Sequence, residues 1–296
     1  MGHGSKIQYA EIASLAPRIS VLVPLATRRF SQVRTVLKRR LIPKLHLGLR
    51  QSFRGSRPVL LVSRKFTSRR AIGDPLSQSK IYEAQLADEL ILVDIERTEE
   101  SWPVLLATVE AVAEALATPL AVGGGVHSFD QVQALLDRGA DKVVLNSAAL
   151  EQPPLIDRVA AAYGAQCLVL SLDARPQPEG GWRVWADGGR LDAGLDALAW
   201  AREAVERGAG EVMATAIERD GTGEGLDLAL TAALADALAV PVIASGGCGL
   251  AQHFVEGYGA GAAAVAAGTF FCQRDQNPMQ CRSHIRNAGF PIRLEV

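Results

Sequence analysis

Short apolar runs of β-strand composition alternate with helix-type patterns from Leu41 onward. In one helical stretch, 128–139, Ser128 fits an N-cap and Gly139 a C-terminal stop. Eight runs are predicted to be strands: 41–47, 90–94, 119–122, 142–146, 167–173, 211–215, 241–245 and 263–268. Eight βα units within about 250 residues favour a closed α/β barrel, the (β/α)8 or TIM barrel, over an open doubly wound sheet.

An internal repeat indicates that this barrel consists of two similar halves. Residues 119–147 match residues 241–269 without gaps, with six identities among 29 positions. The identities fall on strand starts, glycine loops and helix ends, where chance agreement is less expected. Two longer segments, 48–72 and 174–195, follow the first and fifth strands, which are four units apart. We therefore expect two half-barrel repeats.

Composition excludes several classes of protein. The chain of 296 residues is 48% apolar, which argues against disorder over most of its length. No apolar run approaches the roughly 18 residues of a membrane span. The cysteines show neither the density of a disulfide scaffold nor CxxC spacing, and no metal-ligand pattern is present. We expect a cytoplasmic protein that has no membrane or nucleic-acid partner and needs no metal or cofactor.

The near-neutral net charge conceals a basic N-terminal part and an acidic remainder of the chain. Residues 1–70 hold 16 basic residues and one acid, whereas residues 71–296 hold 15 basic and 31 acidic residues. The stretch 1–35 is acid-poor and arginine-containing, as transit peptides are. We favour a different interpretation, in which Val36 is the true start and the barrel occupies 36–296. Of the other eleven basic residues, Arg40 is expected at the bottom of the barrel, and most of the rest form a basic lip over the barrel mouth.

Two glycine-rich loops are expected at the mouth, since the active site of such a barrel lies at the carboxyl ends of its strands. Glycine allows backbone N–H groups to approach a phosphate, and hydroxyl or amide side chains add donors. The two predicted cradles consist of Gly124, Gly125, Asn146 and Ser147 in one half, and Ser245, Gly246, Gly247, Gly268 and Thr269 in the other. A pair of cradles predicts an elongated substrate with a phosphate at each end. The alternative is that the glycines only form tight turns.

Acidic residues lie at the same end of the predicted strands. Asp94 and Asp173 end the second and fifth strands, and Asp220-Gly221 follows Thr215 at the end of the sixth. A carboxylate there can act as general acid or base, or bind substrate hydroxyls. A helix cap or a loop-ordering role is the alternative, more so for Asp94 than for Asp173.

Four charged residues mark the opposite end of the barrel. Arg40, Glu89, Lys142 and Glu211 begin four different strands, so they are expected at the bottom face. Two cations and two anions there predict a salt-bridged plug across the barrel axis. The alternative is that these charged residues only stabilise the fold, which is the usual role of residues at the bottom face of such a barrel.

These residues and several longer strings resemble the cyclase subunit of imidazole glycerol phosphate synthase (HisF). The matching strings are DELILVDI (88–95), GGGVHSFD (123–130), RGADKVVLNSAALEQPPLI (138–156), QCLVLSLDA (166–174), ERDGTGEGLDL (218–228) and PVIASGGCGLAQHF (241–254). The resemblance implies a heterodimer with a glutaminase, whose ammonia travels up the barrel axis to react with a phosphorylated ribulosyl substrate. It makes the bottom quartet an ammonia gate and places Asp141 and Gln166 near the docking face.

The same resemblance exposes two departures at the first strand. Members of the family carry catalytic aspartates at the ends of strands 1 and 5. The second is Asp173, but His46 occupies the place of the first, and Val62 aligns with a substrate-contacting lysine. An imidazole replaces a carboxylate only in part. The first strand and its lengthened loop are more similar to paralogues associated with sugar amidation in surface-polysaccharide synthesis.

Three functions therefore stay open. The first is a partner that channels ammonia from a glutaminase to a separate sugar amidotransferase, with His46 beside Asp173. The second is an active cyclase/lyase of histidine biosynthesis, which makes imidazole glycerol phosphate and an aminoimidazole carboxamide ribotide. The third is a barrel isomerase of the same pathway, against which the gate quartet and the loop 220–225 argue.

Overall fold

The computed structural model describes residues 38–53, 55–273 and 276–293. All of them belong to the unit Val36–Val296. The expectations for residues 1–35 and for a start at Val36 lie outside the described residues. Within these ranges no helix is long and apolar enough to cross a membrane.

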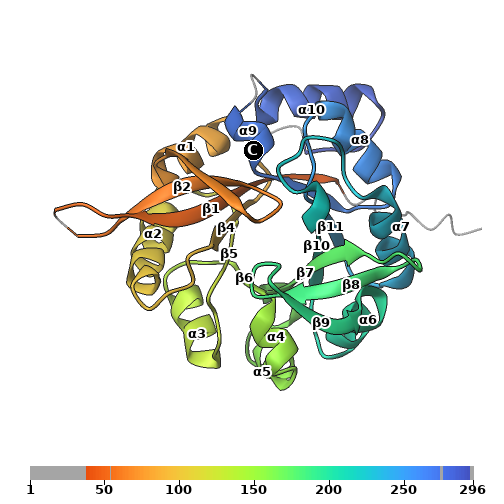
Figure 1. Ribbon diagram of the computed structural model, residues 1–296. Helices are drawn as coiled ribbons and strands as arrows, with labels where there is room; N and C mark the ends of the chain where they lie inside the picture. The colour runs from red at the N-terminus through yellow and green to blue at the C-terminus, as the bar shows by residue number, and fades with distance from the viewer. Residues whose placement is uncertain (1–37, 54, 274–275, 294–296) are drawn as a thin grey trace, which may run out of the picture. The chain divides into compact units, whose positions relative to one another are not determined.

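Eight parallel strands close into a barrel, seen along its axis in Figure 1. Around the barrel they follow the order β1 (Arg40–Arg50), β4 (Leu90–Asp94), β5 (Leu120–Gly123), β6 (Lys142–Leu145), β7 (Leu168–Pro176), β10 (Glu211–Ala216), β11 (Val242–Ser245) and β12 (Ala264–Ala267). Strand β12 pairs with β1, and β10 pairs with β7, so the sheet has no gap. The predicted (β/α)8 barrel is confirmed, and each predicted apolar run overlaps one of its strands.

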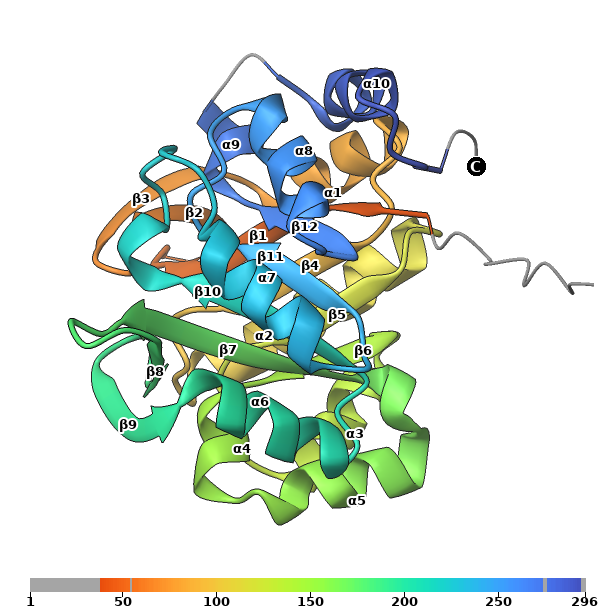
Figure 2. The same cartoon turned by 90° about the vertical axis from the view of Figure 1, so that its right-hand side faces the viewer.

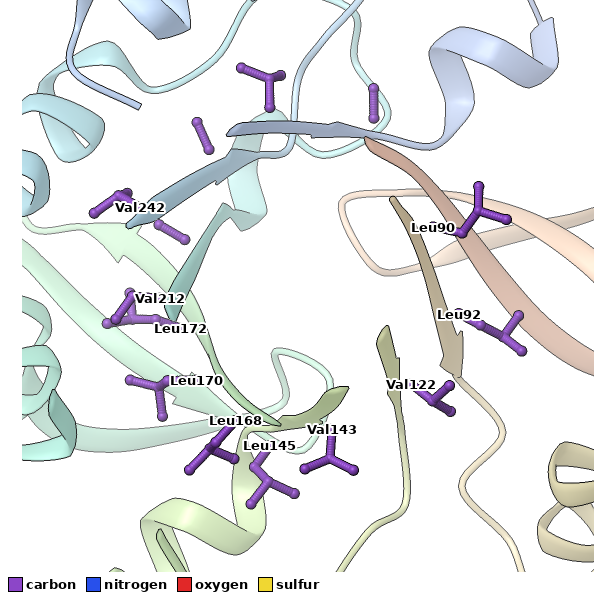
Figure 3. Packing of buried hydrophobic residues seen from close by; sticks show 14 of the residues in the cluster. Leu90, Leu92, Val122, Val143, Leu145, Leu168, Leu170, Leu172, Val212 and Val242 are labelled. Carbon is purple, nitrogen blue, oxygen red and sulfur yellow. The ribbon is translucent and has the colours of Figure 1, made fainter. Parts of the chain in front are cut away.

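Alternation along the strands separates two apolar layers. Side chains such as Leu90, Leu92 and Leu170 point away from the barrel axis and are packed under the helices (Figure 3). A smaller apolar layer fills the barrel interior: Ile42, Ile91, Ala121, Val144, Val169, Met213, Ile243, Ala264 and Ala266. Because successive side chains of a strand face opposite sides, β1 directs residues 40, 42, 44 and 46 to the interior.

Helices surround the strands, as the alternating pattern predicts. They are α1 (Pro75–Ala84), α2 (Ser101–Ala115), α3 (Phe129–Asp137), α4 (Ser147–Glu151), α5 (Pro154–Tyr163), α6 (Ala197–Glu206), α7 (Leu228–Ala237), α8 (Ala251–Gly259), α9 (Thr269–Gln273) and α10 (Pro278–Asn287), with short 3₁₀ turns at Ala165–Cys167 and Ile217–Arg219. Local chemistry fixes their starts. The Ser128 side chain accepts from the backbone N–H of Gln131, and Asn277 and Gln280 form a capping box.

The two long insertions are antiparallel hairpins at one end of the barrel (Figure 2). Strand β2 (Arg57–Arg64) pairs with the extended end of β1 and with β3 (Ser68–Gly73). Strand β8 (Trp182–Ala186) pairs with β7 and with β9 (Leu191–Asp196). They follow strands on opposite sides of the barrel, in agreement with two half-barrel repeats.

Candidate active site at the barrel mouth

A cavity of about 280 Å³ opens at the carboxyl ends of the barrel strands. It brings together eight of the predicted site residues: His46, Asp94, Gly124, Gly125, Asn146, Ser147, Asp173 and Thr215. The remaining predicted residues of the mouth, Asp220, Gly221, Ser245, Gly246, Gly247, Gly268 and Thr269, do not line this cavity. The site is therefore built mainly on the half-barrel that contains the first cradle.

The first cradle depends on a close approach between two strand-end loops. Gly124 has φ +95°, and a Cβ there would collide with the backbone carbonyl oxygen of Asp94. The Asp94 carboxylate accepts from the backbone N–H of Glu96 at 2.9 Å and from the Ser101 hydroxyl at 2.5 Å. Asp94 therefore orders the loop after β4, which is the alternative role that the sequence left open.

Among the carboxylates of the mouth, Asp173 has the environment that best suits a general acid or base. Its side chain is buried, and the amide of Asn146 donates to it at 3.0 Å. Burial raises the pKa of Asp173 to about 7, although the nearby Lys44 ammonium and the Thr215 hydroxyl act in the opposite direction. A carboxyl group that titrates near neutrality is suited to general acid or base catalysis.

His46 faces the same cavity from β1, but it is not a cation. Burial, together with the positive charges of Lys44 and Arg69, lowers the pKa of His46 to about 3. The imidazole is therefore neutral at physiological pH. It offers one donor and one acceptor, whereas a carboxylate would supply a negative charge.

Lys44 is a further residue of the cavity wall that was not among the predicted site residues, and it is the most buried of the cationic residues there. Its side chain is buried, and its Nζ donates to the Ser245 hydroxyl at 2.9 Å. The period-two alternation of β1 was a usable signal, since it places Lys44 on the same face as Arg40 and His46. Ser245 thus belongs to the floor of the mouth rather than only to the second cradle.

The second cradle lies beneath the loop 220–225. The backbone N–H of Gly225 donates to the carbonyl of Gly247 at 2.8 Å, and Gly247 has φ +102°. Gly268 and Thr269 line a separate space of only about 10 Å³, which is the size of one water. The two predicted cradles therefore differ in this structure: the first lines the cavity of about 280 Å³, whereas Gly268 and Thr269 of the second line a space of only about 10 Å³.

The loop 220–225 is held by the β2–β3 hairpin. The Ser63 hydroxyl donates to Asp220 at 3.1 Å, and the backbone N–H of Lys65 donates to the Asp220 carbonyl at 2.8 Å. Burial raises the pKa of Asp220. Gly221 packs against the Ser63 carbonyl oxygen at a distance that leaves no room for a Cβ. Asp220 thus positions a loop and lies near the mouth without lining its cavity.

Three arginines surround the mouth: Arg69 belongs to the basic lip expected from the sequence, whereas Arg97 and Arg190 were not predicted. Asp187, in the turn between β8 and β9, pairs with Arg97 at 2.9 Å and with Arg190 at 2.8 Å. Its backbone N–H also donates to the Ser147 hydroxyl at 2.9 Å. Arg69 pairs with Glu96 at 3.2 Å. Only the hairpin fold brings these residues, distant in sequence, to one rim.

At the other end of the barrel, the four predicted gate residues form a closed ring. Glu89 accepts from Arg40 at 2.6 Å and from Lys142 at 2.9 Å, and Glu211 accepts from the same two cations at 2.8 and 2.9 Å. Burial would raise the pKa of Glu211, but the hydrogen bonds and charges of Arg40 and Lys142 outweigh it and lower that pKa. The predicted salt-bridged arrangement is present at the start of β1, β4, β6 and β10.

The residues predicted at the docking face lie close to this end. Asp141 precedes β6 and accepts from the backbone N–H of Leu120 at 2.8 Å. Gln166 lies just before β7 and donates to the Tyr163 carbonyl at 3.0 Å. Both side chains are exposed. Among the described residues, no cluster of His, Cys, Asp and Glu suits a metal ion.

Comparisons with known proteins agree with this geometry. Residues 53–277 match the family described as "Histidine biosynthesis protein". A relative from Prochlorococcus marinus (strain MIT 9313), which carries the provisional name imidazole glycerol phosphate synthase subunit hisF2, is 62% identical over 88% of this chain and 100% of its own length. The imidazole glycerol phosphate synthase subunit HisF of Gluconacetobacter diazotrophicus is 43% identical over 77% of this chain and 88% of its own length. The chain therefore belongs to the histidine biosynthesis protein family, as a HisF-like barrel.

Proposed function

We propose that this chain is a HisF-like subunit that receives ammonia from a glutaminase and delivers it through the barrel for sugar amidation in surface-polysaccharide synthesis. One observation carries the proposal: a complete gate ring closes the bottom of a barrel whose mouth has a neutral imidazole where the family pattern has a carboxylate. All four residues of the gate ring are present, whereas one of the two catalytic aspartates expected from the family is replaced by His46.

The barrel interior supports passage of an uncharged molecule. Between the gate and the mouth lies the apolar interior layer, which includes the small side chains Ala121, Ala264 and Ala266. Ammonia crosses such a layer as NH₃, because ammonium would lose its hydration without a compensating partner. The gate ring separates this layer from the bottom face, where we place the glutaminase near Asp141 and Gln166. Free thiols at the cysteines agree with a cytoplasmic location.

The experiment reconstitutes the chain with its glutaminase and a sugar amidotransferase, and follows ¹⁵N from the glutamine amide into the sugar. We expect co-purification with the glutaminase, stimulated glutamine hydrolysis and ¹⁵N transfer to the sugar. Arg40→Met should lower transfer at least tenfold, because it breaks the gate ring. Arg138→Met removes an exposed ion pair with Glu110 and should leave transfer unchanged. Failure to bind or stimulate any glutaminase would contradict the proposal.

The second candidate function is the cyclase/lyase reaction of histidine biosynthesis. The pKa of about 7 for Asp173, beside the first cradle, favours it. It predicts turnover of the phosphorylated ribulosyl substrate with ammonium salts alone, and loss of that turnover in Asp173→Asn. Absence of turnover at saturating ammonium in the wild type, together with a gain in His46→Asp, would identify His46 as the residue that separates the two functions.

A further inference from the structure

Lys44 is a buried cation that lacks a direct counter-ion. The residue is 6% exposed, and its ammonium donates to the neutral Ser245 hydroxyl. In the part of the chain that the structure describes, no carboxylate lies within ion-pair distance of Lys44. The other lysine and arginine side chains that line the cavity, Arg69, Arg97 and Arg190, each have a carboxylate partner.

Burial of an ammonium without an anion is costly, so the arrangement implies a ligand. An ammonium has three donors, and the structure assigns one of them. Lys44 lines the cavity, so a bound molecule can reach it. The closest carboxylates in its electrostatic environment, Asp173 and Asp220, both have raised pKa values. Asp173, whose pKa is about 7, is only partly ionised at neutral pH, and neither carboxylate forms an ion pair with Lys44 among the described residues.

We propose that Lys44 binds an oxyanion, a phosphate or carboxylate group of the ligand, at the floor of the barrel mouth. The hydrogen bond to the Ser245 hydroxyl fixes the direction of the ammonium. This site lies deeper than the arginine rim, since Lys44 precedes His46 by one inward-facing position on β1. It adds a binding residue that neither the glycine loops nor the gate supplies.

Anion binding at this position is coupled to a proton. The Lys44 charge acts to lower the pKa of Asp173, so a bound anion that neutralises it raises that pKa further. Near pH 7, Asp173 then takes up a proton as the anion binds. Anion binding at Lys44 and protonation of Asp173 are therefore energetically coupled through the charge of Lys44.

The test uses the full chain without a glutaminase, so it does not depend on the proposed function. Inorganic phosphate and acetate are titrated by calorimetry at pH 7 in buffers of different ionisation enthalpy. We expect Lys44→Met to weaken binding of at least one anion about tenfold and to abolish the associated proton uptake, because one charge-assisted contact is lost. Lys44→Arg should restore affinity to within a few-fold. Lys80→Met, which alters an exposed lysine of α1, is the matched control.

Wild-type protein provides a measurement that does not depend on the folding of a variant. The ¹⁵Nζ resonance of Lys44 should shift on titration with phosphate or acetate. Binding that weakens in Arg97→Met but not in Lys44→Met would place the anion at the rim and overturn the proposal. No Nζ shift at saturating concentrations of either anion would overturn it as well.

Discussion

Two titratable side chains at the mouth affect stability in opposite directions. The pKa of Asp173 is raised to about 7 in the folded state, so its contribution to stability declines as the pH rises from about 4 to 7. The pKa of His46 is lowered to about 3, so the unfolded chain binds a proton that the folded protein does not between about pH 3 and 6.5. Stability from His46 is therefore lost as the pH falls through that range. The two effects partly cancel in the wild type.

Asp173→Asn should remove one of these opposing effects. We expect the free energy of unfolding of the variant, relative to wild type, to increase between pH 4.5 and pH 8 by about 3 kcal/mol, because the amide has no ionisation that burial would suppress. Urea denaturation at several pH values measures this difference. Asp137→Asn, at an exposed position of α3, should show no such trend. A difference that stays constant with pH would show that Asp173 titrates normally.

At the scale of elements, the two hairpins determine which cationic side chains at the barrel mouth are available to bind an anion. The β8–β9 turn supplies Asp187, whose carboxylate forms ion pairs with both Arg97 and Arg190. These two arginines are therefore less available to a bound anion. The hairpin β2–β3 fixes the loop 220–225 and closes the second cradle through Ser63 and Asp220. Neither effect comes from the barrel strands themselves.

Asp187→Asn should strengthen phosphate binding several-fold, because both arginines lose an internal competitor for the anion. Calorimetric titration with inorganic phosphate at low and high salt measures the effect, which should decrease with salt. Asp192→Asn, in the same hairpin and paired with Arg183 at 3.7 Å, serves as the control. A weaker affinity in Asp187→Asn would mean that the carboxylate positions the arginines rather than competing for them.

At the scale of the whole molecule, the barrel separates gate and mouth. Strand β1 places Arg40 at the bottom and His46 at the top, a separation of about 20 Å at ~3.3 Å per residue. On β1, Ile42 of the apolar interior layer separates Arg40 from Lys44 and His46, which line the cavity at the mouth. The two ends should therefore respond to substitution independently.

Glu89→Gln tests this independence. The Glu89 side chain is 3% exposed and bonds both cations of the ring, so the loss of its charge should destabilise the protein by roughly 3 kcal/mol. We expect phosphate affinity at the mouth to remain within twofold of wild type. Denaturation and calorimetry on the same sample give both values. A parallel loss of phosphate affinity would show that the gate and the mouth are coupled.

The sequence by itself determined the barrel, because the alternation of apolar strands and helices has one compact solution with eight units. It also determined the gate and the set around Asp173, since strand ends fix which face a residue occupies. Only the tertiary structure decided the rest. The long-range hydrogen bond from Lys44 to Ser245 made Lys44 part of the site, and contacts of the β2–β3 hairpin closed the second cradle. Such contacts join residues far apart in sequence, and the local pattern carries no signal for them.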